Sequence, residues 1–455
     1  PCLVLAGAGS GKTRTLVYLT AYLLEHKISP QNIMLVTFTN KAAREMLSRV
    51  QALLKFHPKG LWGGTFHHLA NLVLRRYGHF VGYNNNFVIL DEDDSKSLLK
   101  SVIGELNIDT KKKYFPKSDL LSSLISFQKN SLLELESIIS EKYSFIKPEY
   151  IPSIKKIHDH YEQKKKQMQT MDFDDLLTNW RLLLKNNTEV AQKLSNQFLH
   201  ILVDEYQDTN RIQAEIIEML SLIHKNVVAV GDDSQSIYSF RAANINNILD
   251  FPKTFANTKI FKLETNYRST PEILQMANNS IKKNKFQYQK NLKSVKKSSL
   301  KPALVPLADS EVQAGFICQK ILDLQSEGVE LKNIAVLFRS SFQVLELELE
   351  LNKRNIPYEM RGGIRFFEQA HIKDTIAYLK VFQNIRDELS WKRILQLFSG
   401  IGPSAAQKIW EHIREFSNLK NLTQSKINIS YKANTSFSDV MKIFEKLLRI
   451  EKRFV

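Results

Sequence analysis

The residues best suited to phosphate chemistry lie at the start of the chain. Glycines let a backbone turn tightly, so that successive N–H groups face the phosphates of a nucleotide. In this pattern Lys12 reaches the β and γ oxygens, and the Thr13 hydroxyl is a ligand for Mg²⁺. A simple glycine-rich turn is the alternative, and Ala6 stands where the general pattern has glycine. We predict a Walker A phosphate loop made of Gly7, Ala8, Gly9, Ser10, Gly11, Lys12 and Thr13.

Two adjacent acids, Asp204 and Glu205, follow the short apolar run 201–203. An aspartate at the carboxyl end of a strand can hold Mg²⁺ directly or through water, and the glutamate after it can orient and deprotonate the attacking water. For either residue alone, a strand-ending turn or a helix cap is the simpler interpretation. Together with the phosphate loop, the pair indicates a Walker B site, with Asp204 and Thr13 on the metal.

Gln235 and Arg268 are the candidates for stabilising charge on the phosphates. Phosphoryl transfer depends on well-placed cations and hydrogen-bond donors more than on covalent chemistry. Gln235 follows the apolar run 227–230, at the end of a strand where α/β sheets place ligands, and Arg268 follows another run at 260–263. Taken alone, either residue would be interpreted as a solvated loop residue. The catalytic role is inferred from their positions after predicted strands.

Aromatic side chains near these polar residues suggest a second ligand, a single nucleic-acid strand. A base stacked on an aromatic ring contributes about 1–3 kcal/mol whatever its sequence. Tyr238 and Phe240 stand beside Arg241, and Phe38 follows the apolar run 33–37. Because Tyr238 and Phe240 are one residue apart, they also fit the core and edge positions of a short strand.

The elements that would position these residues follow from the apolar pattern. Short apolar runs without polar alternation, typical of buried parallel strands, occur at 2–5, 33–37, 201–203, 227–230, 260–263 and 334–338. Amphipathic stretches at 41–54 and 212–223 follow strands, which is the alternation of a doubly wound α/β fold. Between about 77 and 171 the strand pattern lapses, and 94–106 has helical spacing, so a helical insertion is expected. A second α/β pattern spans 311–338.

Composition and charge narrow the class of partner. A chain of 455 residues with 43% hydrophobic and 24% charged residues is expected to form two to four globular domains. A net charge of +17 favours a polyanionic partner, because clustered Lys and Arg release counterions from phosphate backbones, although a basic surface without a partner is the alternative. Lysine runs at 111–113, 164–166 and 296–297 would contact duplex DNA or form solvated faces.

Cysteine usage and hydropathy favour a cytoplasmic protein. Cys2 and Cys318 are the chain's two cysteines, which leaves no disulfide framework and no CxxC pair for zinc. No apolar run approaches the roughly 20 residues that span a bilayer, so no membrane partner is expected. Because Pro1 leads directly into an apolar strand, we expect the sequence to be part of a longer protein.

Taken in order, these segments resemble the UvrD/PcrA/Rep family of superfamily 1 DNA helicases. The resemblance covers most of the chain and includes the phosphate loop and the segments 37–46, 64–70, 172–176, 203–210, 231–243 and 265–269. It implies an α/β fold with RecA-like parallel sheets of the P-loop NTPase type and mainly helical inserted subdomains. The implied parts are 1–78 and 169–265 for the first RecA-like domain, 79–168 for its helical insertion, 266–373 for the N-terminal part of the second RecA-like domain and 374–455 for an incomplete second insertion.

The resemblance also implies roles for single residues. ATP would lie between the RecA-like domains with Mg²⁺, its adenine between Tyr267 and Arg14, and its γ-phosphate against Gln235 and Arg268. The track for single-stranded DNA would be formed by Phe38, Thr65, His67, Tyr238, Phe240 and Arg241. Family members move 3′ to 5′ and act at junctions of single- and double-stranded DNA. They serve repair or replication, so the resemblance implies repair or replication proteins as partners. The oligomeric state stays open.

Departures from the family pattern carry expectations of their own. Ala242 stands where the family usually has glycine, without an expected change in mechanism. The family's adenine-contacting glutamine motif would precede residue 1, and its late motifs with a second arginine finger would follow residue 455. Residues 362–367 resemble the end of the first half of the second RecA-like domain. The chain alone is therefore expected to bind nucleotide, hydrolyse it poorly and not unwind DNA.

Two other functions share part of this pattern with the plain helicase. The motor part of a recombination helicase-nuclease has similar motifs, and an acidic metal-binding cluster further along the protein would favour it. A DNA clamp without motor activity would have no need for the complete set of Lys12, Thr13, Asp204, Glu205 and Arg268. The segments 172–176 and 235–238 favour a UvrD-like enzyme.

Overall fold

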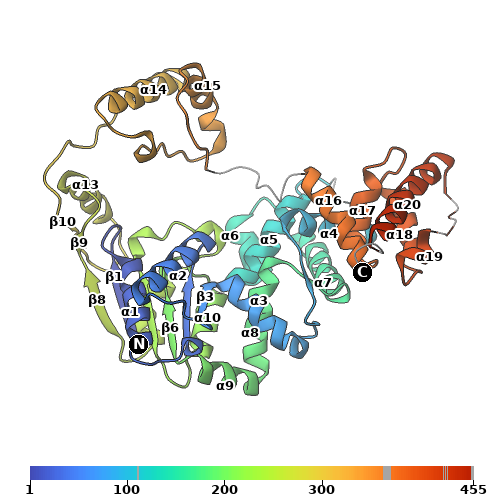
Figure 1. The fold of residues 1–455 in the computed structure, drawn as a ribbon, viewed down its shortest axis with the longest axis horizontal. Helices are drawn as coiled ribbons and strands as arrows, with labels where there is room; N and C mark the ends of the chain where they lie inside the picture. The colour runs from blue at the N-terminus through green and yellow to red at the C-terminus, as the bar shows by residue number, and fades with distance from the viewer. Residues whose placement is uncertain (110–111, 362–369, 424, 426, 428, 452–455) are drawn as a thin grey trace. The chain divides into compact units, whose positions relative to one another are not determined.

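The computed structural model describes residues 1–109, 112–361, 370–423, 425, 427 and 429–451. The chain divides into two compact units, Pro1–Lys301 and Pro302–Val455 (Figure 1). Each unit has its own buried apolar side chains. The segment 362–367, which resembles part of a second RecA-like domain, and Lys111 of the first lysine run lie outside the described residues.

A six-stranded parallel sheet organises the first unit, with strand order β3-β2-β6-β7-β1-β8. Its strands are β1 (Cys2–Ala6), β2 (Ile33–Thr37), β3 (Trp62–Thr65), β6 (His200–Val203), β7 (Val227–Gly231) and β8 (Lys259–Leu263). Five of these were predicted from apolar runs and are confirmed, whereas β3 was not predicted. Because all six strands are parallel, their carboxyl ends meet at one edge of the sheet, and the loops that carry the predicted site residues start there.

Helices cover both faces of the sheet over β1, β2, β6 and β7, as the lack of polar alternation in these strands predicted. The edge strand β8 is exposed along most of its length, so the prediction of a strand covered on both faces is wrong for 260–263. On one face, Val4 packs with Leu16 of α1 (Lys12–Glu25) and Met46 of α2 (Asn40–Leu54). On the other face, Leu3 belongs to a core that includes Trp180 and the helices α3 (Phe66–Tyr77), α8 (Phe173–Asn186) and α10 (Arg211–Leu220). Successive β1 residues thus point into different cores, which is the geometry of a doubly wound sheet.

A helical insertion leaves and rejoins the first unit through a short parallel pair, β4 (Val88–Ile89) with β5 (Thr170–Met171). It contains α4 (Glu92–Glu105), α5 (Ser118–Ser131), α6 (Leu135–Lys142) and α7 (Ile151–Gln167) (Figure 1). The helix predicted at 94–106 is confirmed as α4, with its apolar positions Leu98, Leu99, Val102 and Ile103 buried.

A buried group of charges, the insertion brace, joins this insertion to α8. It consists of Lys129, Glu162, Lys165, Asp172 and Asp175. The Nζ atom of Lys165 lies 2.6 Å from Asp172 Oδ2 and 2.5 Å from Asp175 Oδ2, and that of Lys129 lies 2.6 Å from Asp175 Oδ1. Since the Lys165 side chain is fully buried, the interpretation of 164–166 as a duplex-contacting or solvated lysine face is wrong for its central residue.

The second unit is helical in its described residues. Helices α14 (Ser310–Ser326) and α15 (Leu345–Lys353) share one small core. A larger core is formed by α16 (Ala370–Gln383), α17 (Glu388–Gln396), α18 (Pro403–Ile413) and α20 (Tyr431–Glu451). Among the helices the structure describes, none combines the length and the apolar character that crossing a membrane requires.

The prediction of a strand at 334–338 is wrong. A buried parallel strand needs hydrogen-bonded neighbours and covered faces. Here Leu337 is 94% exposed, and the segment pairs with no strand in the part of the chain that the structure describes. The α/β class with a RecA-like parallel sheet is therefore confirmed for the first unit. The described residues of the second unit do not form a second RecA-like sheet.

Candidate nucleotide and DNA site

The phosphate loop connects β1 to α1 and is shaped by its glycines. Gly9 and Gly11 have φ angles of +75° and +98°, which side-chain-bearing residues rarely adopt. The amide and the hydroxyl of Ser10 both donate to the carbonyl of Gly7, at 3.2 and 2.7 Å, and close the turn. Helix α1 begins at Lys12 with no side-chain cap and no acid in its first turn. Its first N–H groups are therefore available to an anion at the positive end of the helix.

The acid pair after β6 lies against this loop, although about 190 residues separate them in the sequence. Lys12 Nζ donates to Glu205 Oε2 at 2.7 Å, and Thr13 Oγ1 donates to Asp204 Oδ2 at 3.4 Å. In the sheet β6 and β1 flank β7, so both loops start from the same edge. The structure thus brings together the four residues predicted to bind and cleave a nucleoside triphosphate.

Asp204 has the environment of a metal ligand. Its burial, and next the nearby Glu205, raise the pKa of its carboxyl to about 6. Its Oδ1 atom is buried and accepts no hydrogen bond from any residue that the structure describes. A buried carboxylate oxygen without a partner is costly, and a divalent cation would satisfy it. Together with the Thr13 hydroxyl it offers the oxygen ligands that Mg²⁺ prefers, so these residues fit Mg²⁺.

Gln207 and Asp208, which the sequence interpretation did not assign, extend this acidic group. Gln207 Nε2 donates to Glu205 at 2.8 Å and to Asp208 at 3.2 Å. Its Oε1 accepts from the backbone N–H of Asp232 at 2.9 Å, which links the loops after β6 and β7. Burial, followed by the charge of Glu205, raises the pKa of Asp208 to about 7. A Cβ on Gly231 would lie 2.6 Å from Gln207 Oε1, so this link requires glycine there.

Gln235 lies in a half-buried turn after β7. Its Nε2 atom donates to Asp232 Oδ2 at 2.7 Å, which fixes the orientation of the side-chain amide. The turn belongs to the same sheet edge as Asp204, through the Gln207 link. The structure therefore positions Gln235 near the acid pair, as predicted, through a neighbour that the sequence interpretation did not single out.

Arg268 and Tyr267 lie against the phosphate loop itself. The N–H of Tyr267 donates to Gly9 O at 3.0 Å, and a Cβ on Gly9 would lie 2.6 Å from the Cβ of Arg268. Buried Asn266, which was not predicted, holds this arrangement. Its Oδ1 accepts from Arg268 N at 2.9 Å, and its Nδ2 donates to Ala8 O. The side chains of Arg268 and Tyr267 are both exposed and accessible to a ligand.

Arg14 and Tyr18 occupy successive turns of α1 beside the loop. The guanidinium of Arg14 lies 5.1 Å from the centre of the Tyr18 ring, and both side chains are exposed. Arg14 was predicted to stack on adenine opposite Tyr267. The structure adds Tyr18 as a neighbour that supports the Arg14 side chain through a cation–π contact.

An aromatic group, the stacking platform, consists of Phe38, Tyr238 and Phe240 with Arg241. The rings of Phe38 and Tyr238 are 5.0 Å apart, those of Tyr238 and Phe240 are 5.9 Å apart, and the Arg241 guanidinium lies 5.6 Å from the Phe240 ring. Residues 239–241 form a 3-10 turn, which excludes the alternative of a short strand. Phe240 is 65% exposed, so the platform offers an apolar face to a ligand.

Ala242 ends this turn in a strained conformation. Its φ of +62° and ψ of 16° lie in the left-handed region, which favours glycine. This is the position at which the chain departs from the family pattern. The backbone keeps the shape that glycine would take, at a conformational cost of about 1 kcal/mol.

Thr65 and His67 lie at the same sheet edge, where β3 leads into α3, but they are less accessible. The Thr65 side chain is buried, and its hydroxyl accepts from the His68 N–H at 3.3 Å as the cap of α3. Burial lowers the pKa of His67 to about 4, so its ring is neutral at pH 7, and it packs edge-on against Phe173. Neither residue presents a positive charge to a DNA phosphate.

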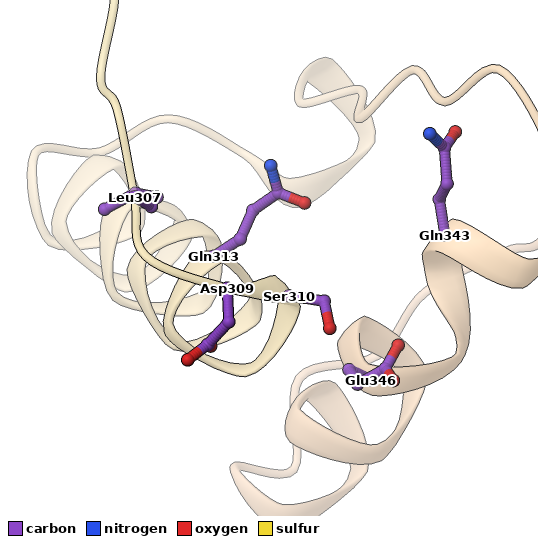
Figure 2. Close-up of a pocket in the computed structure, with 6 residues that line it drawn as sticks. All are labelled: Leu307, Asp309, Ser310, Gln313, Gln343 and Glu346. Carbon is purple, nitrogen blue, oxygen red and sulfur yellow. The ribbon is translucent and has the colours of Figure 1, made fainter.

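A separate cavity of about 340 Å³ lies in the second unit (Figure 2). It is lined by Leu307, Asp309, Ser310, Gln313, Gln343 and Glu346. Two carboxylates and no basic side chain occur among these residues, so the cavity is unsuited to phosphate.

A parallel sheet whose phosphate loop and acid pair meet at one edge defines the class, an α/β P-loop fold with a RecA-like sheet. Residues 1–256 match the UvrD/REP helicase N-terminal domain, and residues 261–446 match the UvrD-like helicase C-terminal domain. The chain therefore belongs to the UvrD/REP helicase family, which confirms the resemblance drawn from its motifs.

Individual relatives support the same assignment. The chain is 37% identical over 411 residues to the ATP-dependent DNA helicase PcrA of Staphylococcus aureus, and 38% identical over 411 residues to that of Staphylococcus epidermidis. Each alignment covers 90% of this chain and 55% of the relative. The chain thus spans about half the length of the curated relatives it matches.

Proposed function

We propose that the chain provides the ATP-binding and strand-binding residues of an ATP-dependent DNA helicase motor that translocates 3′ to 5′ along single-stranded DNA in repair or replication. One observation carries the proposal. The stacking platform and the phosphate-binding residues lie at the same edge of one parallel sheet, and a single loop after β7 contains both Gln235 and Tyr238. The family membership and the relatives named ATP-dependent DNA helicase PcrA support it.

For ATP hydrolysis, the proposal assigns each residue of the site a separate task. The Lys12 ammonium, paired with Glu205 in this structure, would move its hydrogen bonds to the β and γ oxygens of ATP. Glu205 would then be free to orient and deprotonate the attacking water. Thr13 and Asp204 would hold Mg²⁺, which supplies charge neutralisation to the phosphates when bound.

The γ-phosphate would be sensed by Gln235 and Arg268, while Tyr267 and Arg14 would hold the adenine. The Cβ of Arg268 packs against Gly9 of the phosphate loop, and Gln235 precedes the stacking platform by only a few residues. Loss of the γ-phosphate would therefore shift the loop that carries Tyr238 and Phe240. This is how the nucleotide state would change the grip on DNA.

Single-stranded DNA would stack its bases on Phe38, Tyr238 and Phe240, with Arg241 near the backbone. Stacking is independent of sequence, as a translocating motor requires. Thr65 and His67 would border this track as uncharged hydrogen-bonding groups. The net charge of +17 supports a nucleic-acid partner and, on the same grounds, binding to junctions of single- and double-stranded DNA.

The test is DNA-stimulated ATP hydrolysis by the wild type and the Lys12→Ala variant. We expect the variant to lose at least about 100-fold in turnover, because no other side chain replaces the phosphate-binding cation. Lys59→Ala, an exposed lysine in the loop before β3, is the matched control and should retain full turnover. Undiminished hydrolysis by Lys12→Ala would refute the proposal. Translocation assays on strands labelled at either end would separately test the 3′ to 5′ direction.

A further inference from the structure

Residues 288–292 form a strap that lies across the nucleotide site without belonging to any of its motifs. The strap is fixed at several points. The Tyr288 hydroxyl donates to Leu249 O at 3.1 Å, and Asn291 N donates to Glu264 Oε1 at 2.7 Å. Leu292 exchanges two backbone hydrogen bonds with the Asn278 side chain, at 3.0 and 3.2 Å. These contacts make the strap a firmly held part of the first unit.

The strap packs directly on the phosphate loop. A Cβ on Gly7 would lie only 2.5 Å from the Cδ2 atom of Leu292. The Leu292 side chain therefore packs against the phosphate loop at the position where residue 7 has no side chain. This contact places the strap next to the phosphate loop.

The strap also supplies a buried cation, Lys290, to the loop after β7. Its Nζ atom lies 2.8 Å from Asp232 Oδ1 and forms a second ion pair with Asp233 Oδ1, and the Lys290 side chain is 6% exposed. Burial alone would raise the pKa of Asp232, but the charge of Lys290 reverses this effect and lowers it. Two adjacent buried acids thereby share one lysine from a distant segment.

The second oxygen of Asp232 holds the proposed γ-phosphate sensor. Asp232 Oδ2 accepts from Gln235 Nε2 at 2.7 Å, while Oδ1 of the same carboxylate is engaged by Lys290. A chain of contacts therefore runs from Lys290 through Asp232 to Gln235. Asp232 Oδ1 also accepts from the Ser234 N–H at 3.1 Å, so removing the cation would leave this oxygen held by a single backbone contact, and the acceptor of the Gln235 amide would be less firmly fixed.

We propose that Lys290 is a positioning residue for the γ-phosphate: through Asp232 it holds Gln235 in register with the phosphate loop on which the strap rests. This inference depends on the proposed role of Gln235. Lys290 itself does not contact the nucleotide. A purely structural Lys290 would neutralise Asp232 and Asp233 for stability and leave recognition of the γ-phosphate unchanged.

The test compares the affinities of the full chain for ATPγS and ADP, which differ in the γ-position, by titration with fluorescent analogues. In Lys290→Met we expect the preference for ATPγS over ADP to fall about tenfold, the size of one lost hydrogen bond to a charged group, with ADP affinity unchanged. Lys290→Arg should restore the preference, because it keeps the cation. Lys285→Met, which removes an exposed lysine from the segment just before the strap, is the matched control and should retain the preference.

Two further variants keep the outcome decisive. If Lys290→Met does not fold, the double variant Lys290→Met with Asp233→Asn removes one negative charge along with the positive one, and the same tenfold loss is expected. Gln235→Ala serves as the reference. If it lowers the preference and the Lys290 variants do not, the positioning role is overturned while the proposed function stands. If Gln235→Ala itself has no effect, the sensor role fails, and the inference about Lys290 fails with it.

Discussion

Two buried groups of charged side chains lie in the first unit, the insertion brace and the nucleotide site, and their carboxylates differ in how they are satisfied. In the brace, both oxygens of Asp172 and both of Asp175 accept a hydrogen bond or an ion pair. In the nucleotide site, Asp204 and Asp208 each have one buried oxygen that accepts no hydrogen bond from the described residues. The Lys12 ammonium forms its ion pair with the neighbouring Glu205.

This difference separates a structural group from a binding group. When buried charges are fully paired, removing one partner lowers the stability of the protein. Buried acids without partners lower stability in the absence of ligand, and they are useful only if a ligand such as Mg²⁺ completes them. The brace therefore fastens α5 and α7 of the insertion to α8, whereas the nucleotide site is completed by what it binds.

The largest expected effect is on stability, from Lys165→Met in the brace. Removing this buried cation leaves Lys129 as the remaining partner of both Asp172 and Asp175, and the free energy of unfolding of the first unit should fall by about 3–5 kcal/mol. Hydrogen exchange of α8 in increasing urea would measure it. Lys166→Met, the exposed neighbour, should change stability by less than about 0.5 kcal/mol. Equal stability of the two variants would remove the distinction between brace and surface.

In the nucleotide site, removing a buried charge should raise the free energy of unfolding instead of lowering it. The pKa of Asp204 in the folded protein, about 6, lies above its unfolded value of about 3.9. The Asp204 carboxylate therefore lowers the free energy of unfolding; this loss is absent below pH 4, grows between pH 4 and 6 and is complete above pH 6. Without nucleotide, Asp204→Asn should therefore be more stable than the wild type at pH 7.5, by up to about 3 kcal/mol. Near pH 4 the two proteins should be equally stable. Urea denaturation at both pH values measures this difference, and lower stability of the variant at pH 7.5 would contradict it.

The smallest expected effect concerns DNA and leaves the fold unchanged. Phe240→Ala removes one exposed ring, so affinity for single strands should fall by about 1–3 kcal/mol, equally for oligo-dT and oligo-dA. Unfolding should be unaffected. Leu222→Ala, an equally exposed apolar side chain in the loop that leads into β7 at the other edge of the sheet, is the control in fluorescence anisotropy titrations. A loss of stability in Phe240→Ala, or unchanged affinity, would show that the platform belongs to the fold and not to DNA binding.

Local sequence patterns were sufficient for five of the six strands and for the phosphate loop, but not for β3, whose sequence Trp-Gly-Gly-Thr contains no apolar run. Buried parallel strands are continuous apolar runs, and the glycines of the loop are next to the lysine they serve, so both are visible within a few residues. The acid pair was predicted because it ends such a run. The meeting of Asp204 with Thr13 then follows from the rule that parallel strands share one carboxyl edge.

Long-range partners were not visible in this way. Lys165 occurs in a run of three lysines, and nothing nearby distinguishes a solvated lysine from one paired to Asp172 and Asp175. Asn266 and Lys290 have their roles only because the fold brings them to Ala8 and Asp232. The run 334–338 has the composition of a buried strand, but a strand also needs neighbours, which a single segment cannot specify.

The Mg²⁺ dependence of nucleotide binding tests the central claim most directly, since that claim is one shared metal site formed by Thr13 and Asp204. The affinity of the wild type for ATPγS should rise on the order of tenfold or more when Mg²⁺ is added. Thr13→Ala and Asp204→Asn should each abolish most of this increase, and the double variant should lose no more than either single variant. If Asp204→Asn keeps the full Mg²⁺-dependent increase, the acid pair and the phosphate loop do not form one nucleotide site.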